Sequence, residues 1–166
     1  MTACEHWFDV ASLLYDQKIA RPSLWLGDDN LRTQASEKFG QSVCYMYEMV
    51  HRPFEISNID YNGEGIEFFS SPCYLRAKDR CLKMMDRLDL NGAFERKDRE
   101  VYFHNLLMWT LVKFFKRPPD ALIMAEAPHG HAQYLIYEVC KFYGVRCGRF
   151  NSFLLETITQ KRSKVI

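Results

Sequence analysis

A run of five apolar residues without alternation, Ala121 to Ala125, constrains the fold of this 166-residue chain more than any other feature. The pair Pro118-Pro119 precedes it, and a loop containing Pro128 follows it. An unbroken apolar run of this length is typical of a parallel strand that is covered on both faces. Parallel strands need crossover connections, which are usually helices. The run therefore predicts an α/β fold rather than a helix bundle or a β-sandwich.

Helical and strand patterns alternate along the rest of the chain. Apolar spacing predicts helices over residues 7–18, 30–39, 75–88, 103–114 and 132–143, ended by Pro22, Gly40, Asn91-Gly92, Pro118-Pro119 and Gly144. Short apolar runs predict further strands at Leu24 to Leu26, Val43 to Val50, Ile66 to Phe69 and Val145 to Phe150. We expect a Rossmann-like, mainly parallel sheet with helices on both faces. It forms a single domain over residues 1–166, with residues 152–166 as a linker or C-terminal tail.

Composition excludes several classes of protein. Twenty-two Lys and Arg residues nearly balance 21 Asp and Glu residues, so there is no global basic field to hold a nucleic acid. The six cysteines show no CxxC pair, which argues against a disulfide framework or a zinc module and favours buried thiols in a reducing compartment. No segment reaches the ~20 apolar residues that a spanning helix needs. We expect a cytoplasmic protein without a transmembrane segment.

The loop after the apolar strand gathers Glu126, His129, Gly130 and His131. Ligands of α/β sheets bind beyond the carboxyl ends of parallel strands, at helix N-termini. A histidine beside a helix N-terminus is disfavoured as a cation, which leaves it neutral and able to accept a proton. Glu126 and His129 are therefore candidate catalytic residues, and Gly130 and His131 candidate substrate-binding residues. Alternatively, these side chains only cap the helix. Zinc is the weaker option, because His-x-His needs a further ligand that the sequence does not locate, and no metal site is assigned.

A second loop leaves the first predicted strand and enters the next helix, so its polar groups should face the same crevice. It contains Gly27, Asp28, Asp29 and Asn30. Asp28 is a candidate base, and Gly27 and Asp29 are candidate substrate-binding residues. Asp and Asn are also ordinary helix caps, and that role fits at least one of them.

Two stretches resemble capsular and surface-polysaccharide biosynthesis proteins in their N-terminal half. One is the segment Pro22 to Asp29; the other runs from Pro119 to His129 and continues with Tyr134 to Val139. The shared pattern is a P-D-x-hydrophobic strand, a loop of small residues ending in Pro-His, and a helix of the Y-x-x-Y-E-hydrophobic kind. The two stretches cover about a sixth of the chain.

The resemblance implies a glycosyltransferase-like domain that supplies the acceptor side of a sugar-transfer site. A sugar nucleotide would be the donor, a glycan or sugar the acceptor, and no cofactor is bound covalently. Such enzymes bind the sugar nucleotide mainly through a C-terminal domain, so the resemblance implies a second domain or a partner chain, in the cytoplasm or at the inner face of the membrane. The alternative is a non-catalytic Rossmann-like binding or interaction module. A small hydrolase is a third reading, but no G-x-S-x-G nucleophile elbow occurs.

Overall fold

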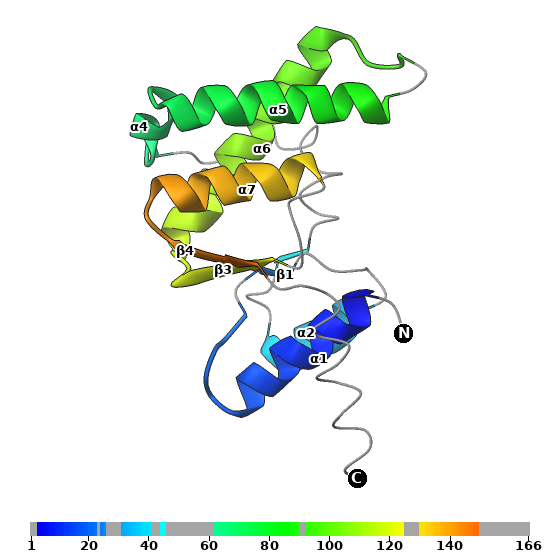
Figure 1. The fold of residues 1–166 in the computed structure, drawn as a ribbon, viewed down its shortest axis with the longest axis vertical. Helices are drawn as coiled ribbons and strands as arrows, with labels where there is room; N and C mark the ends of the chain where they lie inside the picture. The colour runs from blue at the N-terminus through cyan, green and yellow to red at the C-terminus, as the bar shows by residue number, and fades with distance from the viewer. Residues whose placement is uncertain are drawn as a thin grey trace. The chain divides into compact units, whose positions relative to one another are not determined.

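The computed structural model describes residues 3–22, 24–25, 31–40, 44–45, 62–89, 92–124 and 130–149. These residues are mostly helical, with short strands between the helices (Figure 1). The order is α1 (Ala3–Asp16), β1 (Leu24–Trp25), α2 (Arg32–Phe39), β2 (Cys44–Tyr45), α4 (Ile66–Phe69), α5 (Pro72–Leu88), α6 (Arg96–Lys116), β3 (Ala121–Met124), α7 (His131–Phe142) and β4 (Arg146–Arg149). Within this part of the chain, no helix combines the length and the apolar character needed to cross a membrane.

The chain divides into two compact units, one built around α1 and α2 and the other around α4 to α7. In the first unit, Phe39 is the central side chain. It is fully buried together with Ala35, and the rings of Phe8 and Tyr15 from α1 lie 5.7 Å and 5.4 Å from its ring. Aromatic pairs at such distances stabilise a core beyond the area that they bury.

The ends of the first two helices differ in how well the sequence predicts them. Gly40 ends α2 with a φ of 83°, as expected of a C-terminal glycine. However, α1 ends at Asp16, ahead of the predicted stop at Pro22, and Lys18 takes a φ of 57° directly after it.

The first two strands form a parallel pair in the register Leu24 to Cys44 and Trp25 to Tyr45. The strands predicted at residues 24–26 and 43–50 are confirmed at these positions. Leu26, Val43 and residues 46–50 lie outside the described residues.

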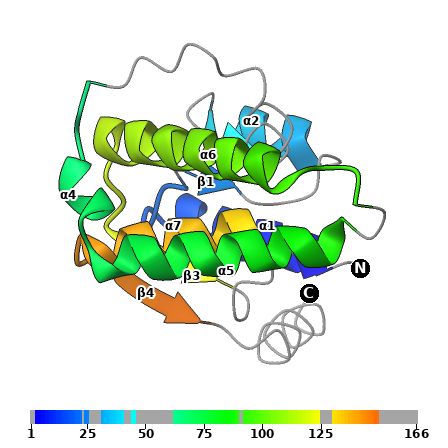
Figure 2. The same ribbon diagram turned by 90° about the horizontal axis from the view of Figure 1, so that it is seen from above.

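Helices α5, α6 and α7 form the core of the second unit, with α7 alongside α5 and α6 packed against both (Figures 1 and 2). The predicted apolar stripes of α6 and α7 are confirmed, because their side chains are buried, apart from Phe114 and Tyr143, which are half-buried. The buried members are Phe103, Leu106, Leu107 and Thr110 on α6 and Ala132, Leu135, Ile136 and Val139 on α7. Gly144 follows α7 with a φ of 73°, as predicted.

The buried face of α5 agrees with the prediction only in part. The apolar spacing predicts a stripe of Leu75, Leu82, Met85 and Leu88. Met85 is buried and Leu82 half-buried, but Leu75 and Leu88 are 66% and 71% exposed. The buried residues are Ala77, Cys81 and Met85, which recur every four residues. Small side chains at 77 and 81 let neighbouring helices approach closely, and the larger leucines are displaced to the outer side.

The strand predicted at Ile66 to Phe69 is wrong, because these residues form the short helix α4. Gly65 begins it in the left-handed conformation, and Phe68 is fully buried, its ring 5.4 Å from that of Phe142. Ser71 links α4 to α5: its hydroxyl donates to the Phe68 carbonyl at 2.6 Å and accepts from the Tyr74 amide at 3.2 Å. A side-chain N-cap of this kind stabilises a helix at these residues relative to an extended strand.

The strand predicted at Ala121 to Ala125 is confirmed over Ala121–Met124, and the last predicted strand over Arg146–Arg149. The two strands pair with each other. Burial alternates along β3, with Ile123 44% exposed, so the expected cover on both faces is not seen. The described strands form two separate two-stranded sheets. One continuous Rossmann-like sheet in a single domain therefore stays a prediction.

Gly65 and Gly63 provide a matched pair for testing the packing of the second unit. Both have positive φ, 81° and 87°. A Cβ at Gly65 would lie 2.7 Å from Phe115 and 3.0 Å from Leu111, whereas one at Gly63 would meet no described atom within 4 Å. We expect Gly63→Ala to cost about 1 kcal/mol of unfolding free energy for the left-handed backbone alone. Gly65→Ala should cost about 1 to 3 kcal/mol more for overpacking. Urea denaturation measures both, and equal losses would contradict this packing.

The described thiols test the expectation of buried, unpaired cysteines. Cys73, Cys81, Cys140 and Cys147 are all free. Cys81 and Cys140 are buried, and burial raises the pKa of each thiol to about 12, whereas Cys147 is exposed. Because the thiolate is the reactive form, we expect iodoacetamide at pH 8 to alkylate Cys147 in the native protein well before Cys81 and Cys140. Peptide mapping gives the order, and equal rates would show that the two buried thiols are accessible. Cys44, also expected to be buried, has no described side chain.

Candidate functional site

Two of the seven predicted site residues, Gly130 and His131, lie in the described part of the chain, where they begin α7. The other five are Gly27, Asp28, Asp29, Glu126 and His129, which fall outside the described residues. The structure therefore tests one corner of the predicted site.

Gly130 is the N-cap residue of α7, with extended backbone angles of −106° and 155°. Its carbonyl accepts the Tyr134 amide at 3.0 Å, which closes the first helical turn. It offers no side-chain cap, and a Cβ placed on it would meet nothing within 4 Å among the described atoms. Among the described residues, none fills the space beside the Gly130 Cα.

His131 is tied into the interior by both neighbouring helices. Its Nε2 lies 3.0 Å from the hydroxyl of Tyr102 on α6, and the two rings meet edge to face at 5.4 Å. Its backbone carbonyl accepts the thiol of Cys81 on α5 at 3.3 Å. Its Nδ1 is buried and has no hydrogen-bond partner among the described residues. These contacts fix the start of α7 against α5 and α6.

Burial determines the protonation of this cluster. It lowers the pKa of His131, and it raises the pKa of Tyr102 far above neutrality. The imidazole is therefore neutral and the phenol protonated at pH 7. The direction of the His131 shift agrees with the prediction for a histidine at a helix N-terminus, but its cause is desolvation rather than the helix dipole. A neutral imidazole can accept a hydrogen bond from the Tyr102 hydroxyl.

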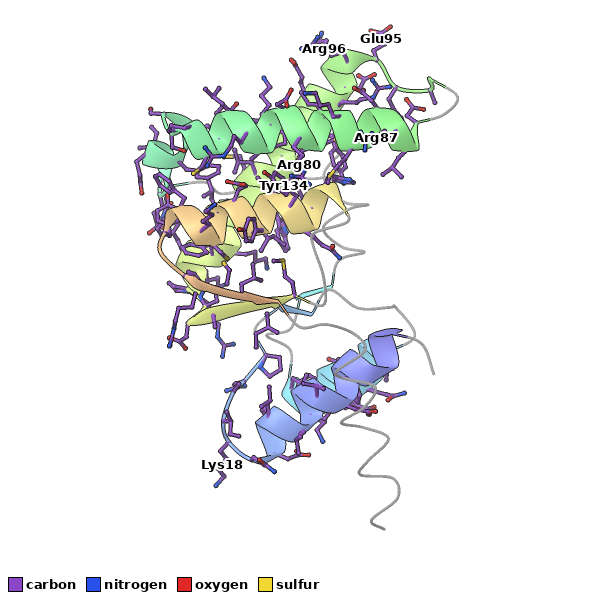
Figure 3. All side chains as sticks on the ribbon, in the orientation of Figure 1. Lys18, Arg80, Arg87, Glu95, Arg96 and Tyr134 are labelled. Atoms are coloured by element: carbon purple, nitrogen blue, oxygen red, sulfur yellow. The ribbon has the colours of Figure 1, made fainter. Side chains whose placement is uncertain are left out.

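Sequence reasoning missed a buried polar cluster between α5 and α7. Glu138 is only 3% exposed, and one carboxylate oxygen accepts the Tyr134 hydroxyl at 2.7 Å. Its other oxygen lies 3.4 Å from the guanidinium of Arg76. The guanidinium of Arg80 lies over the Tyr134 ring, 4.5 Å from its centre (Figure 3). The four-residue spacing of Tyr134 and Glu138, matched by that of Arg76 and Arg80, was the available signal.

Two hollows lie along α5. The larger, about 500 Å³, runs between α5 and the start of α6. Its cations are already paired: Arg99 with Asp86 and Asp89 at 2.6 Å and 2.7 Å, Lys78 and Arg96 with Glu100 at 3.8 Å and 3.6 Å, and Lys83 with Asp79 at 2.8 Å. The smaller, about 350 Å³, is lined by Asp79, Arg80, Lys83, Met84 and Arg87. Among the described side chains, no group of three potential metal ligands comes together.

No family model, curated protein or solved structure matches this chain. The chemistry of the site must accordingly be argued from the chain's own residues.

Burial of His131 has a consequence for stability against pH. The folded state keeps the imidazole neutral, whereas an unfolded histidine takes up a proton near pH 6.5. The contribution of the neutral His131 side chain to the free energy of unfolding is therefore complete above pH 6.5 and is lost as the pH falls below it. We expect His131→Gln to flatten the fall of unfolding free energy between pH 7.5 and pH 5.5 in urea titrations. His104→Gln, at an exposed histidine, is the control and should keep the wild-type slope. Equal slopes in all three proteins would show that His131 is accessible to protons in the folded state.

Proposed function

We propose that this chain contributes the acceptor side of a sugar-transfer site in surface or capsular polysaccharide biosynthesis. The observation that carries the proposal is the sequence of elements β3, loop and α7. The helix begins at Gly130 without a side-chain cap, no described residue fills the space at its Cα, and the first residue of the helix is a histidine whose pKa burial lowers. The remaining Rossmann-like features, one parallel sheet with helices on both faces, belong to this proposal.

An inverting transfer needs a base that takes the proton of the acceptor hydroxyl. In the proposal Glu126, His129 or Asp28 is this base, while Gly27, Asp29 and Gly130 line the acceptor site. The contact of His131 with Tyr102 favours a different role for this residue from the substrate-binding one expected of it. It holds the start of α7 in place against α5 and α6.

The donor in this proposal is a sugar nucleotide, bound mainly by a second domain or a partner chain. The acceptor is a glycan or a sugar. Sugar nucleotides are made in the cytoplasm, where free thiols such as those of Cys81 and Cys140 persist. A cytoplasmic protein, in solution or at the inner membrane face, fits these partners.

One observation favours the alternative, a non-catalytic binding or interaction module. The two hollows described above lie along α5, and neither is lined by Gly130 or His131. A surface used only for binding would need no base in the loop before α7.

His129→Ala separates the two functions. If His129 is the base, transfer should fall about 10²- to 10⁴-fold, while the melting temperature changes little, because a loop imidazole contributes little packing. The assay follows release of nucleoside diphosphate from a panel of sugar nucleotides by the complete protein, or by this chain with its second half. Glu126→Gln and Asp28→Asn test the other candidate bases, and His104→Ala is the matched control.

Unchanged transfer by the His129 variant would remove His129 from the mechanism. If transfer by the His129 variant falls only in proportion to the fraction of unfolded protein, His129 is a structural helix cap and not the base. Should no member of the panel be hydrolysed or transferred by the wild-type protein, the module is the better description.

A further inference from the structure

A row of cations runs along one side of α5. Arg76, Arg80, Lys83 and Arg87 follow one another at intervals of four, three and four residues, which places them on one face of the helix. The last three line the 350 Å³ hollow, together with Met84 and Asp79. In a chain whose formal net charge is +1, this row is a local concentration of positive charge.

The row follows α7 toward its beginning. Arg76 meets Glu138, Arg80 meets Tyr134, and Cys81 meets His131, so the two helices are antiparallel. Continuing this register places Met84 level with Gly130, and Arg87 beyond it. Figure 3 shows Arg80 and Tyr134 between the two helices and Arg87 farther along α5. The row of cations therefore runs toward the start of α7.

Arg80 is held in place before any ligand binds. Its guanidinium lies over the ring of Tyr134, whose hydroxyl is fixed by the buried carboxylate of Glu138. Stacking on a ring leaves the edge of a guanidinium free to donate hydrogen bonds. Arg80 thus loses less side-chain freedom on binding an anion than an unsupported arginine would.

Nearby carboxylates neutralise only part of the row. Glu138 is occupied by Tyr134 and Arg76, and Asp86 and Asp89 are bound to Arg99. Asp79 pairs with Lys83 at 2.8 Å, but both side chains are more than 60% exposed, so this pair is weak. Arg87 is exposed and makes no ion pair with any described residue.

We propose that Arg80, Lys83 and Arg87 bind the diphosphate group of a phosphorylated ligand. Arg80 and Arg87 are two helical turns apart, about 10.5 Å along the axis, and long side chains from both ends with Lys83 between them can converge on two linked phosphates. Planar guanidinium groups bind phosphate oxygens in pairs. The inference deepens the proposed function and rests on it for the identity of the ligand, which is either the sugar nucleotide or a lipid-linked diphosphate acceptor.

Calorimetric titration of the purified full chain with inorganic pyrophosphate, at low ionic strength, tests the site. We expect Arg80→Ala and Arg87→Ala each to weaken binding about tenfold or more. Arg96→Ala is the matched control, because Arg96 is 84% exposed on α6 and lies outside the row; it should bind as the wild type does. Asp79→Asn should strengthen binding about two- to fivefold, since it removes the competing carboxylate.

The result that overturns the proposal is a wild-type protein that does not bind pyrophosphate, or one whose binding is weakened equally by Arg96→Ala and Arg87→Ala. Arg87→Ala removes no ion pair or hydrogen bond with a described residue, so it remains informative if loss of Arg80 destabilises the fold. Uridine diphosphate and geranyl diphosphate then distinguish a nucleotide from a lipid source. Pyrophosphate binding with this variant pattern in a protein without transfer activity would contradict the proposed function and leave the diphosphate site intact.

Discussion

The second unit depends on how one buried carboxylate is satisfied. Glu138 lies inside α7, and a buried charge without partners costs several kcal/mol. Tyr134 and Arg76 supply those partners, one from the same helix and one from α5. The Arg76 contact belongs to one antiparallel register of α5 and α7. The contact of Arg80 with the Tyr134 ring and that of the Cys81 thiol with His131 occur in the same register.

Much of the fold could be predicted because its signals are local. The apolar stripes of α6 and α7, the glycine after α2 and the strand at Ala121 are all encoded within a few residues of where they act. The strand prediction for Ile66 to Phe69 failed because this short segment fits a strand or a helical turn equally well. Gly65 and Ser71 decided between them, through a backbone angle and a cap. The prediction that Leu75 and Leu88 of α5 are buried failed for another reason. Which face of this helix is buried depends on helices that are distant in the sequence.

The candidate site stays a prediction, because five of its seven residues lie outside the described part of the chain. The sequence favoured a neutral histidine beside the start of α7, and burial lowers the pKa of His131, which is the same direction. No local pattern could show that Tyr102 and Cys81 surround it, because they lie 29 and 50 residues away in the chain. A separation of 62 residues likewise hid the contact of Glu138 with Arg76.

The separation of these partners also governs how the second unit can assemble. Arg76 and Glu138 are 62 residues apart, so α5 is complete long before α7 leaves the ribosome. Until then, the face that carries Ala77, Cys81 and Met85 has no α7 to cover it. Contacts of such long range require a large loop to close first, which slows folding. During synthesis, the nascent chain therefore presents this apolar face to chaperones and to other chains for the time that the ribosome takes to add those residues.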